Sequence, residues 1–251
     1  MIIDRPRDCH IPQLRVLWKE AFGDTDAFLD GFFSVAFSPE RSLCLWEGDR
    51  LSAALYWFDC TWESKKVAYI YGVATDPAFR GKGFCRHLME DTHDLLKAQG
   101  YHGSILVPGS QGLFSLYRKI GYVPCCGKTV QTDLPSGEPA VLTGITVEAY
   151  AGLQKQYLPE DSVFHDQVAL QFAATYTQFY KGEGFAFCGG MEGETFYFQE
   201  FLGDTKKLPA ILAALQAGHG QVRIFGDVPF AMYLPLDGET DLPCYFDIPL
   251  N

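Results

Sequence analysis

"VATDPAFRGKGFCRHLM", residues 73–89, joins a β-favouring segment to a helical pattern through a turn that contains Pro77. The first N–H groups of a helix have no partner inside the helix, and the aligned peptide dipoles favour an anion there. Two glycines before the helical pattern would let an anion approach the backbone, and three basic side chains are close in sequence: Arg80, Lys82 and Arg86. The stretch therefore predicts either a phosphate cradle or a glycine turn that only begins a helix.

Two common phosphate loops do not fit this sequence. A dinucleotide-binding loop needs Gly-x-Gly-x-x-Gly, but GKGFCR has Arg86 in place of the third glycine. A Walker loop needs Gly-x-x-x-x-Gly-Lys-Ser/Thr, and the segment that ends in Gly127-Lys128-Thr129 has Tyr122 in place of the first glycine. Neither a dinucleotide fingerprint nor a Walker loop is therefore expected.

The surrounding pattern alternates helices and strands. We expect two helices within 12–37, a hairpin at 42–60, a central apolar strand at 66–75 and a helix at 81–99. A strand at 104–109 and a helix at 112–122 follow. After a boundary near the Pro- and Gly-rich segment 132–144, we expect a helix at 163–180, a hairpin at 185–204 and a helix near 208–215. Strands are expected near 221–226, 230–236 and 244–249.

The succession of strand, Pro turn, Arg-x-x-Gly-x-Cys and amphipathic helix resembles the GNAT superfamily of acetyl-coenzyme A-dependent N-acetyltransferases. The family signature is Gln/Arg-x-x-Gly-x-Gly/Ala: Arg80 and Gly83 match it, and Cys85 stands in the Gly/Ala position. LYRKIGY, residues 116–122, is similar to the family's Tyr-x-x-x-Gly-Phe/Tyr segment. FRGKGFCR also resembles loops of tandem acetyltransferases of the enhanced-intracellular-survival type.

This resemblance implies an α/β protein with a GNAT fold, in which helices flank a mixed, mainly antiparallel central sheet. We expect a catalytic GNAT domain that binds acetyl-CoA at 1–130 and a degenerate GNAT-like domain at 131–251. The implied reaction moves an acetyl group from acetyl-CoA to a primary amine by direct attack in a ternary complex. Two alternatives are a non-catalytic sensor that binds CoA or acyl-CoA, and an assembly subunit.

The resemblance also implies site residues. The expected cofactor-binding residues are Val73, Ala74, Thr75, Arg80, Gly81, Lys82, Gly83, Phe84, Cys85 and Arg86. Tyr117 matches the tyrosine that protonates the leaving thiolate, although core packing would also explain it. For the base, tandem relatives imply the C-terminal carboxylate of Asn251. A water chain to Glu47, Asp59 or Glu63 is an alternative.

The early aromatic residues have two interpretations. They recur at helical spacing, which is typical of a buried stripe, and they could also line an acceptor pocket, as the early helices often do in this family. The residues are Trp18, Phe22, Phe28, Phe32 and Phe33.

Composition limits the partners. The formal net charge is −11, from 31 acidic and 20 basic residues, which opposes nucleic-acid binding and favours a cationic small-molecule or peptide amine. The eight cysteines contain no Cys-x-x-Cys pair and the six histidines lack metal-ligand spacing, so no metal cofactor is expected. The N-terminus MIIDRPRDCH has no signal-like apolar core, and no apolar run is long enough to span a membrane. We therefore expect a cytoplasmic protein with reduced thiols, and the sequence leaves the oligomeric state open, a homo-oligomer included.

Overall fold

The computed structural model describes residues 1–248 and 250, and its internal contacts divide the chain into two units. Unit 1 comprises Met1–Pro124 and Met232–Leu242, and unit 2 comprises Cys125–Ala231 and the chain from Pro243 onward. This division differs from the expected contiguous domains 1–130 and 131–251. The segment 232–242 returns to unit 1 because the strand that begins at Ala231 pairs with a strand of the first sheet.

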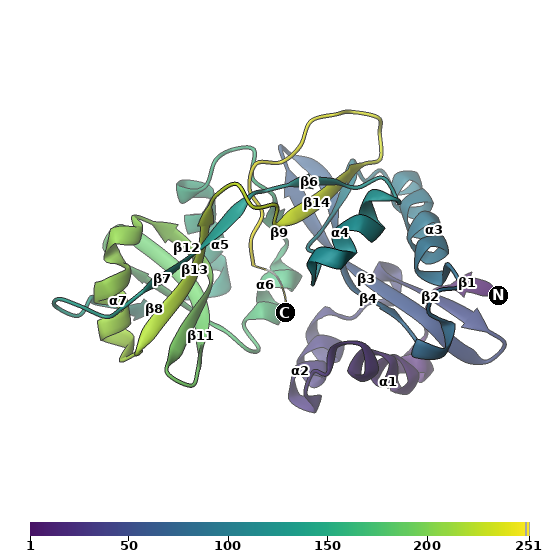
Figure 1. The fold of residues 1–251 in the computed structure, drawn as a ribbon, viewed down its shortest axis with the longest axis horizontal. Helices are drawn as coiled ribbons and strands as arrows, with labels where there is room; N and C mark the ends of the chain where they lie inside the picture. The colour runs from purple at the N-terminus through teal and green to yellow at the C-terminus, as the bar shows by residue number, and fades with distance from the viewer. Residues whose placement is uncertain (249, 251) are drawn as a thin grey trace. The chain divides into compact units, whose positions relative to one another are not determined.

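Unit 1 is built on one mixed sheet (Figure 1) with the strand order β1-β2-β3-β4-β5-β14-β6. Its strands are β1 (Ile2–Asp4), β2 (Ser42–Glu47), β3 (Arg50–Trp62), β4 (Lys65–Thr75), β5 (Gly103–Leu106), β6 (Val123–Cys125) and β14 (Ala231–Pro235). Strands β1 to β4 pair antiparallel in succession, β4 pairs with β5 in parallel, and β14 pairs antiparallel with β5. Strand β4 lies in the middle of this order, as its apolar sequence predicts.

The helices of unit 1 begin and end close to the expected positions. They are α1 (Ile11–Phe22), α2 (Asp26–Gly31), a π-helical turn (Phe32–Ala36), α3 (Phe84–Ala98) and α4 (Gln111–Arg118). Thr25 caps α2 by accepting a hydrogen bond from the Phe28 amide at 3.2 Å. The predicted start of α3 at residue 81 is wrong by three residues, because Gly81 and Gly83 have φ of +76° and +83°, which no α-helix accommodates.

Side chains of the first sheet alternate between two faces. One face forms a core with α3 and α4, which includes Leu55, Ala68, Ile70, Leu88, Met89, Leu96, Phe114 and Tyr117. The other face meets α1 and the π-helical turn, where aromatic rings dominate: Trp18 and Phe32 contact both Tyr56 and Tyr71. Strands β3 and β4 are therefore covered on both sides.

Unit 2 has its own mixed sheet, with the order β7-β13-β12-β11-β10-β8. Its strands are β7 (Lys128–Asp133), β8 (Thr143–Gly144), β10 (Gln178–Gly182), β11 (Phe185–Glu192), β12 (Thr195–Gly203) and β13 (His219–Phe225), while Phe164–His165 form the short strand β9. The pair β12–β13 is parallel, whereas the pairs β7–β13, β12–β11, β11–β10 and β10–β8 are antiparallel. The helices are α5 (Val147–Tyr157), α6 (Gln167–Ala173) and α7 (Leu208–Leu215).

Two predictions for unit 2 are wrong. The expected helix at 163–180 is only α6, because the Asp166 side chain caps a helix start at Gln167 and residues 178–182 pair as β10. The expected strand at 244–249 is reduced, within 244–248, to one bridge between Tyr245 and Ser162. The expected hairpin at 185–204 is confirmed as β11 and β12.

Among the described residues, none of the helices is both long and apolar enough to cross a membrane.

Candidate active site

The carboxyl-terminal half of β4 is irregular in a way that exposes its backbone. Ala54 of β3 is opposite Ala74, and Tyr56 is opposite Tyr71, so two residues of β4, Gly72 and Val73, face one residue of β3. This is a β-bulge, which re-aims the backbone groups of the bulged strand and is frequent beside active sites. Gly72 has φ +59°, and a Cβ there would lie 2.9 Å from the Trp18 ring. Only glycine fits this position.

Strand β4 also separates from β5 early. The two are in register only from Val67 opposite Gly103 to Tyr69 opposite Ile105, whereas β4 continues to Thr75. The pairing of β4 with β5 therefore ends at Tyr69, and among the described residues the β4 backbone at 72–75 is not in register with β5. Such an edge can pair with the amides of an extended ligand as an added strand would.

The turn after β4 is fixed by Asp76. Its carboxylate accepts hydrogen bonds from the Ala78 amide at 2.8 Å and from Arg50 Nη2 at 2.6 Å. Burial pushes the pKa of Asp76 up, but these bonds outweigh burial and the pKa is lowered overall, so the carboxylate is ionised at neutral pH. Arg80 folds back, its Nε donating to the Thr75 carbonyl at 3.1 Å. The loop is thereby tied to the end of the strand.

Residues 81–86 form an exposed helix start. Gly81 and Gly83 adopt left-handed φ, and a Cβ on Gly81 would meet nothing within 4 Å. The glycines are therefore required by backbone conformation and leave the surface open above them. The first internal bond of α3 runs from the His87 amide to the Gly83 carbonyl, so the amides of Phe84, Cys85 and Arg86 have no partner within the helix. This arrangement fits an anionic ligand.

The basic side chains around this loop are held differently. Lys82 Nζ lies 4.7 Å from the centre of the Phe79 ring, and Arg86 Nε is 2.7 Å from a Glu90 carboxylate oxygen. Both lysine and arginine are exposed, so each can turn toward a phosphate at small cost.

Tyr117 lies on α4 (Gln111–Arg118). It is buried in the same core cluster that Val73, Phe84 and Cys85 contact. Burial, and then the nearby Cys85, raise the pKa of Tyr117, so its hydroxyl keeps its proton at neutral pH. The Tyr117 ring also lies 5.8 Å from that of Tyr122.

Tyr122 is fixed in turn by two polar partners. Its hydroxyl lies 2.9 Å from His93 Nε2 and 2.6 Å from Ser104 Oγ. Burial lowers the pKa of His93 to about 4, so the imidazole is neutral. The side chains behind Tyr117 are therefore uncharged and hydrogen-bonded.

The structure thus gathers the strand end 73–75, the loop 80–86 and Tyr117 in one region of unit 1. Asn251 lies outside the described residues. Asp59 is opposite Ala68 and accepts a hydrogen bond from the Tyr101 hydroxyl, while Glu63 lies in the turn just before β4. At about 3.3 Å per residue, Asp59 is roughly 23 Å along the strand from Thr75 and Glu63 is more than about 30 Å from it, so both are poor candidates for a water chain.

Sequence reasoning missed three residues that shape the site. The bulge glycine, Gly72, could have been suspected because an isolated glycine inside an apolar strand is typical of a bulge. Asp76 before Pro77 is a recognisable cap for a helical turn. Arg50 gave no signal, because its pairing with Asp76 arises only from the hairpin register.

The early aromatic residues prove to be partly core and partly surface. Trp18 and Phe32 are buried, whereas Phe22 is 47% exposed and Phe28 and Phe33 are half-buried. The Trp18 ring contacts Phe22, Phe28 and Phe32, and its Nε1 donates to Asp24 at 2.7 Å. Because Trp18 also packs on the bulge at Gly72, the half-exposed rings lie on the side of β4 away from α3.

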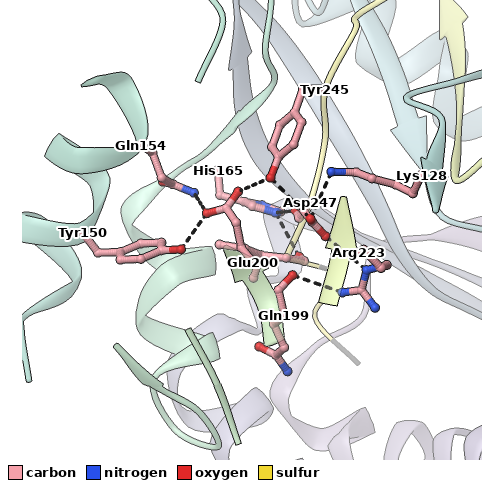
Figure 2. Close-up of polar contacts among 10 residues, drawn as sticks. Lys128, Tyr150, Gln154, His165, Gln199, Glu200, Arg223, Tyr245 and Asp247 are labelled. Atoms are coloured by element: carbon pink, nitrogen blue, oxygen red, sulfur yellow. Dashed lines mark hydrogen bonds and ion pairs between the residues drawn. The ribbon is translucent and has the colours of Figure 1, made fainter. Parts of the chain in front are cut away.

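Unit 2 contains a second polar cluster, which is buried (Figure 2). Glu200 accepts hydrogen bonds from Tyr150, Gln154 and Tyr245, at 2.9, 2.7 and 3.2 Å. Burial, and then the charge of Asp247, raise the pKa of Glu200 to about 7. Asp247 pairs with Lys128 at 3.1 Å and Arg223 at 3.3 Å.

This cluster holds the C-terminal segment of the chain. His165 Nε2 lies 3.0 Å from the Asp247 carbonyl and 3.1 Å from that of Ile248. Burial lowers the pKa of His165 to about 4, so the ring is neutral and donates to these carbonyls. The side chains that hold Glu200 and Asp247 all have partners within unit 2, whereas the buried Gln199 Oε1 beside them has no hydrogen-bond partner among the described residues. A buried cluster in which most polar groups are paired is typical of a structural network.

Comparison with known proteins agrees with this geometry. A family model described as an acetyltransferase (GNAT) domain matches residues 3–125. A GCN5-related N-acetyltransferase from Anabaena variabilis superposes with a TM-score of 0.70 and 14% identity over 94% of this chain and 72% of that one. Another from Kribbella flavida gives 0.70 and 15%, over 94% and 71%. Eis1 from Mycobacterium abscessus gives 0.68 and 9%, over 94% and 74%.

At these identities the solved structures show the fold, and because they cover most of the chain the likeness extends to both units. The chain has the expected α/β GNAT fold with a second GNAT-like unit. No curated protein matches the chain in sequence.

Proposed function

We propose that the chain transfers an acetyl group from acetyl-CoA to a primary amine, because residues 3–125 match the family model of a GNAT acetyltransferase domain. The observation that supports the proposal is the β4 backbone at 72–75, which is not in register with β5 and leads through a short turn to the helix start at 81–86. An extended chain with two amides and a diphosphate matches these two features in order.

In this proposal the diphosphate of acetyl-CoA lies on the amides of residues 84–86, with Arg80 and Lys82 beside it. The pantetheine arm pairs with the edge of β4. The bulge at Gly72–Val73 turns an amide of the strand toward the thioester carbonyl, where it stabilises the oxyanion by about 3–4 kcal/mol. Orientation by two separate anchors also removes much of the entropy cost of the attack.

The amine attacks the carbonyl carbon directly, the C–S bond breaks, and the sulfur leaves as CoA thiolate. Tyr117 supplies the proton to that sulfur, because its phenol is protonated at neutral pH and lies beside the first turn of α3. The attacking nitrogen must also lose a proton. The base stays a prediction, with the C-terminal carboxylate of Asn251 as its candidate.

The acceptor is proposed to be a cationic amine. The net charge of −11 attracts cations at long range. The partly exposed rings of Phe22, Phe28 and Phe33 offer aromatic faces next to β4, and such faces favour ammonium groups by about 0.5–1 kcal/mol each.

The test combines binding and turnover. Calorimetry should detect CoA binding to the full chain, and a panel of amines should release CoA thiol from acetyl-CoA. Tyr117→Phe should lower kcat by about 100- to 10,000-fold and leave the Kd for CoA unchanged. Tyr197→Phe makes the same chemical change at an exposed position of unit 2 and should alter neither quantity.

The outcomes separate the alternatives. Binding of CoA without thiol release from any amine would favour a sensor. Absence of CoA binding at millimolar concentration would overturn the proposal and favour an assembly role.

A further inference from the structure

A cluster of one histidine and two carboxylates lies at the opposite end of β4 from the loop at 80–86. His102 directly precedes β5, where Gly103 is opposite Val67 near the start of β4. Asp237 and Glu239 belong to the segment that returns to unit 1 after β14. One ligand atom from each of the three residues lies within 4.8 Å of the other two.

The turn that carries the carboxylates is ordered by its own hydrogen bonds. Asp237 Oδ1 accepts the Glu239 amide at 3.1 Å, and Gly238 between them has φ +89°. The Leu236 amide donates to the His102 carbonyl at 2.8 Å, which holds this turn against the imidazole. Both carboxylates are thereby aimed at one ring.

The two nitrogens of His102 have unequal surroundings. Nδ1 contacts the Asp237 carboxylate, so it carries the hydrogen that it donates. Nε2 then carries a lone pair, yet it is buried without a hydrogen-bond partner in the described chain, and the side chain is only 9% exposed. The nearest carboxylate oxygen, Glu239 Oε2, is 3.5 Å away. A lone pair facing a carboxylate is repulsive unless a cation lies between them.

The spacing fits a metal ion better than a hydrogen bond. A distance of 3.5 Å is longer than the usual N–H···O contact. Two donors bound to one tetrahedral ion at about 2.0–2.1 Å lie roughly 3.3 Å apart. A carboxylate on the other ring nitrogen is also the usual companion of a metal-bound histidine, because it fixes the tautomer and raises the basicity of the ligand.

We propose that His102 Nε2 and Glu239 bind a divalent transition-metal ion such as Zn²⁺, with Asp237 orienting the imidazole. Water completes the coordination, because the Asp237 and Glu239 side chains are 35% and 50% exposed. The ion joins the start of β5 to the returning segment 237–239. It is remote from the acetyl-transfer site and acts as a structural clip of unit 1.

Lys65 is the competitor of the metal. Its Nζ lies 2.7 Å from the same Glu239 oxygen that faces His102. An ammonium at that position must move before Glu239 can bind an ion. Removing the Lys65 charge should therefore tighten metal binding, whereas it would only weaken an ordinary ion-pair cluster.

The experiment uses the full chain and Zn²⁺ as the probe, with calorimetry and thermal unfolding as readouts. The wild-type chain should bind one Zn²⁺ in a component that Glu239→Gln weakens at least tenfold. Asp241→Asn, an exposed acid in the same segment, should leave that component unchanged. Lys65→Met should strengthen it several-fold, and the rise in Tm with Zn²⁺ should follow the same order.

Two results would overturn the site. If Zn²⁺ binds equally to the wild-type and Glu239→Gln chains, the ion is held elsewhere, for example by the cysteines. If no Zn²⁺ binds at 1 mM free ion, the cluster is an ordinary group of polar side chains and holds no metal. Glu239 is half exposed, so its variant should fold, and circular dichroism checks this.

Discussion

The two units share one order of helices and strands. They differ at the point where two adjacent parallel strands separate. In unit 1 the register between β4 and β5 ends at Tyr69, and the β4 backbone at 72–75 is not paired with β5. In unit 2, β12 and β13 are in register only over Thr195–Phe198, and beyond that point Arg223 of β13 donates to the Gln199 carbonyl of β12 at 3.1 Å (Figure 2). Asp247 of the C-terminal segment then pairs with Arg223. Side chains of unit 2 thus occupy the point where its parallel strands separate, which in unit 1 is the proposed site of the pantetheine arm.

The segments that follow β4 in unit 1 and β12 in unit 2 also differ. In unit 1, two left-handed glycines lead into the 15-residue helix α3. In unit 2 a 3-10 turn at Thr205–Lys207 leads into α7, which has 8 residues and Pro209 in its first turn. Proline has no amide hydrogen to offer an anion. The fold is shared, and the chemistry depends on a few residues at one strand end.

The largest predicted effect concerns the closed gap of unit 2. Asp247→Asn leaves the buried Lys128 ammonium without its anionic partner and weakens the hold on Arg223. We expect a loss of about 3–5 kcal/mol in the stability of unit 2, seen as a lower urea midpoint. Asp227→Asn, an exposed change of the same kind, serves as the control. Equal midpoints for the two variants would mean that these ion pairs do not hold the gap closed.

The next effect depends on pH and on Glu200. Its folded pKa of about 7 lies above the ordinary value of 4.5, so the folded state binds this proton more tightly than the unfolded state. The resulting stability, about 3 kcal/mol, is fully present below about pH 4.5 and is lost as pH rises through 7. Glu200→Gln keeps a hydrogen-bonding side chain and removes the titration.

Urea denaturation at several pH values measures this difference. Relative to the wild-type chain, Glu200→Gln should gain stability between pH 5 and pH 8. Glu192→Gln, at an exposed position of β11, should follow the wild-type pH profile. Parallel profiles for wild type and Glu200→Gln would contradict a carboxyl group that is protonated in the folded state near pH 6.

The sequence predicted unit 1 more completely than unit 2, for physical reasons. The loop at 80–86 is local: a strand, a Pro turn, two glycines and a helix follow one another, so backbone preferences alone specify it. Tyr117 could be linked to this loop only through the family resemblance. The β4 bulge and the Arg50–Asp76 pair depend on the register between β3 and β4. The alternation of apolar and polar residues does not determine that register to within one residue.

Unit 2 was harder because its determining contacts are distant in sequence. Lys128 and Asp247 are 119 residues apart, and no pattern joins them. Glu200 lies beside Phe201 in QEF, and Asp247 follows two aromatic residues in YFD. An acidic residue next to aromatic residues indicates a buried carboxylate, and a buried carboxylate needs a polar or charged partner. The return of β14 to the first sheet is likewise non-local, which is why a contiguous boundary was expected.

A smaller effect is expected from alanine substitution of two glycines that share a backbone conformation, one in each unit. Gly81 has φ +76° and Gly184 has φ +78°, and a Cβ on either would meet nothing within 4 Å. Alanine at either position should therefore cost the same 1–2 kcal/mol of backbone strain. Only Gly81→Ala disturbs the helix start that faces the proposed diphosphate, so it should raise the Kd for CoA about tenfold. Equal CoA affinities for both variants would place the anion site elsewhere.

The smallest effect is expected at Cys85, the one departure from the family signature. The side chain is half-buried and packs against the core cluster that contains Tyr117. Burial raises the pKa of the Cys85 thiol to about 11, so at pH 7–8 it is neutral and resists alkylation, whereas the exposed Cys9 should react. A thiol that points into the core takes no space from a ligand on the amides of the same turn.

Cys85→Ala should therefore change the Kd for CoA by less than about twofold and lower stability by about 1 kcal/mol, the usual result of removing one buried heavy atom. Calorimetry with CoA and urea denaturation measure the two quantities on the same samples. If the alanine variant instead binds CoA tenfold more tightly, the thiol projects into the ligand site. The Cys85 side chain would then block part of the proposed CoA site in unit 1, as Arg223 and Asp247 fill the corresponding place in unit 2. The two units would then differ only in how much of this place their side chains occupy.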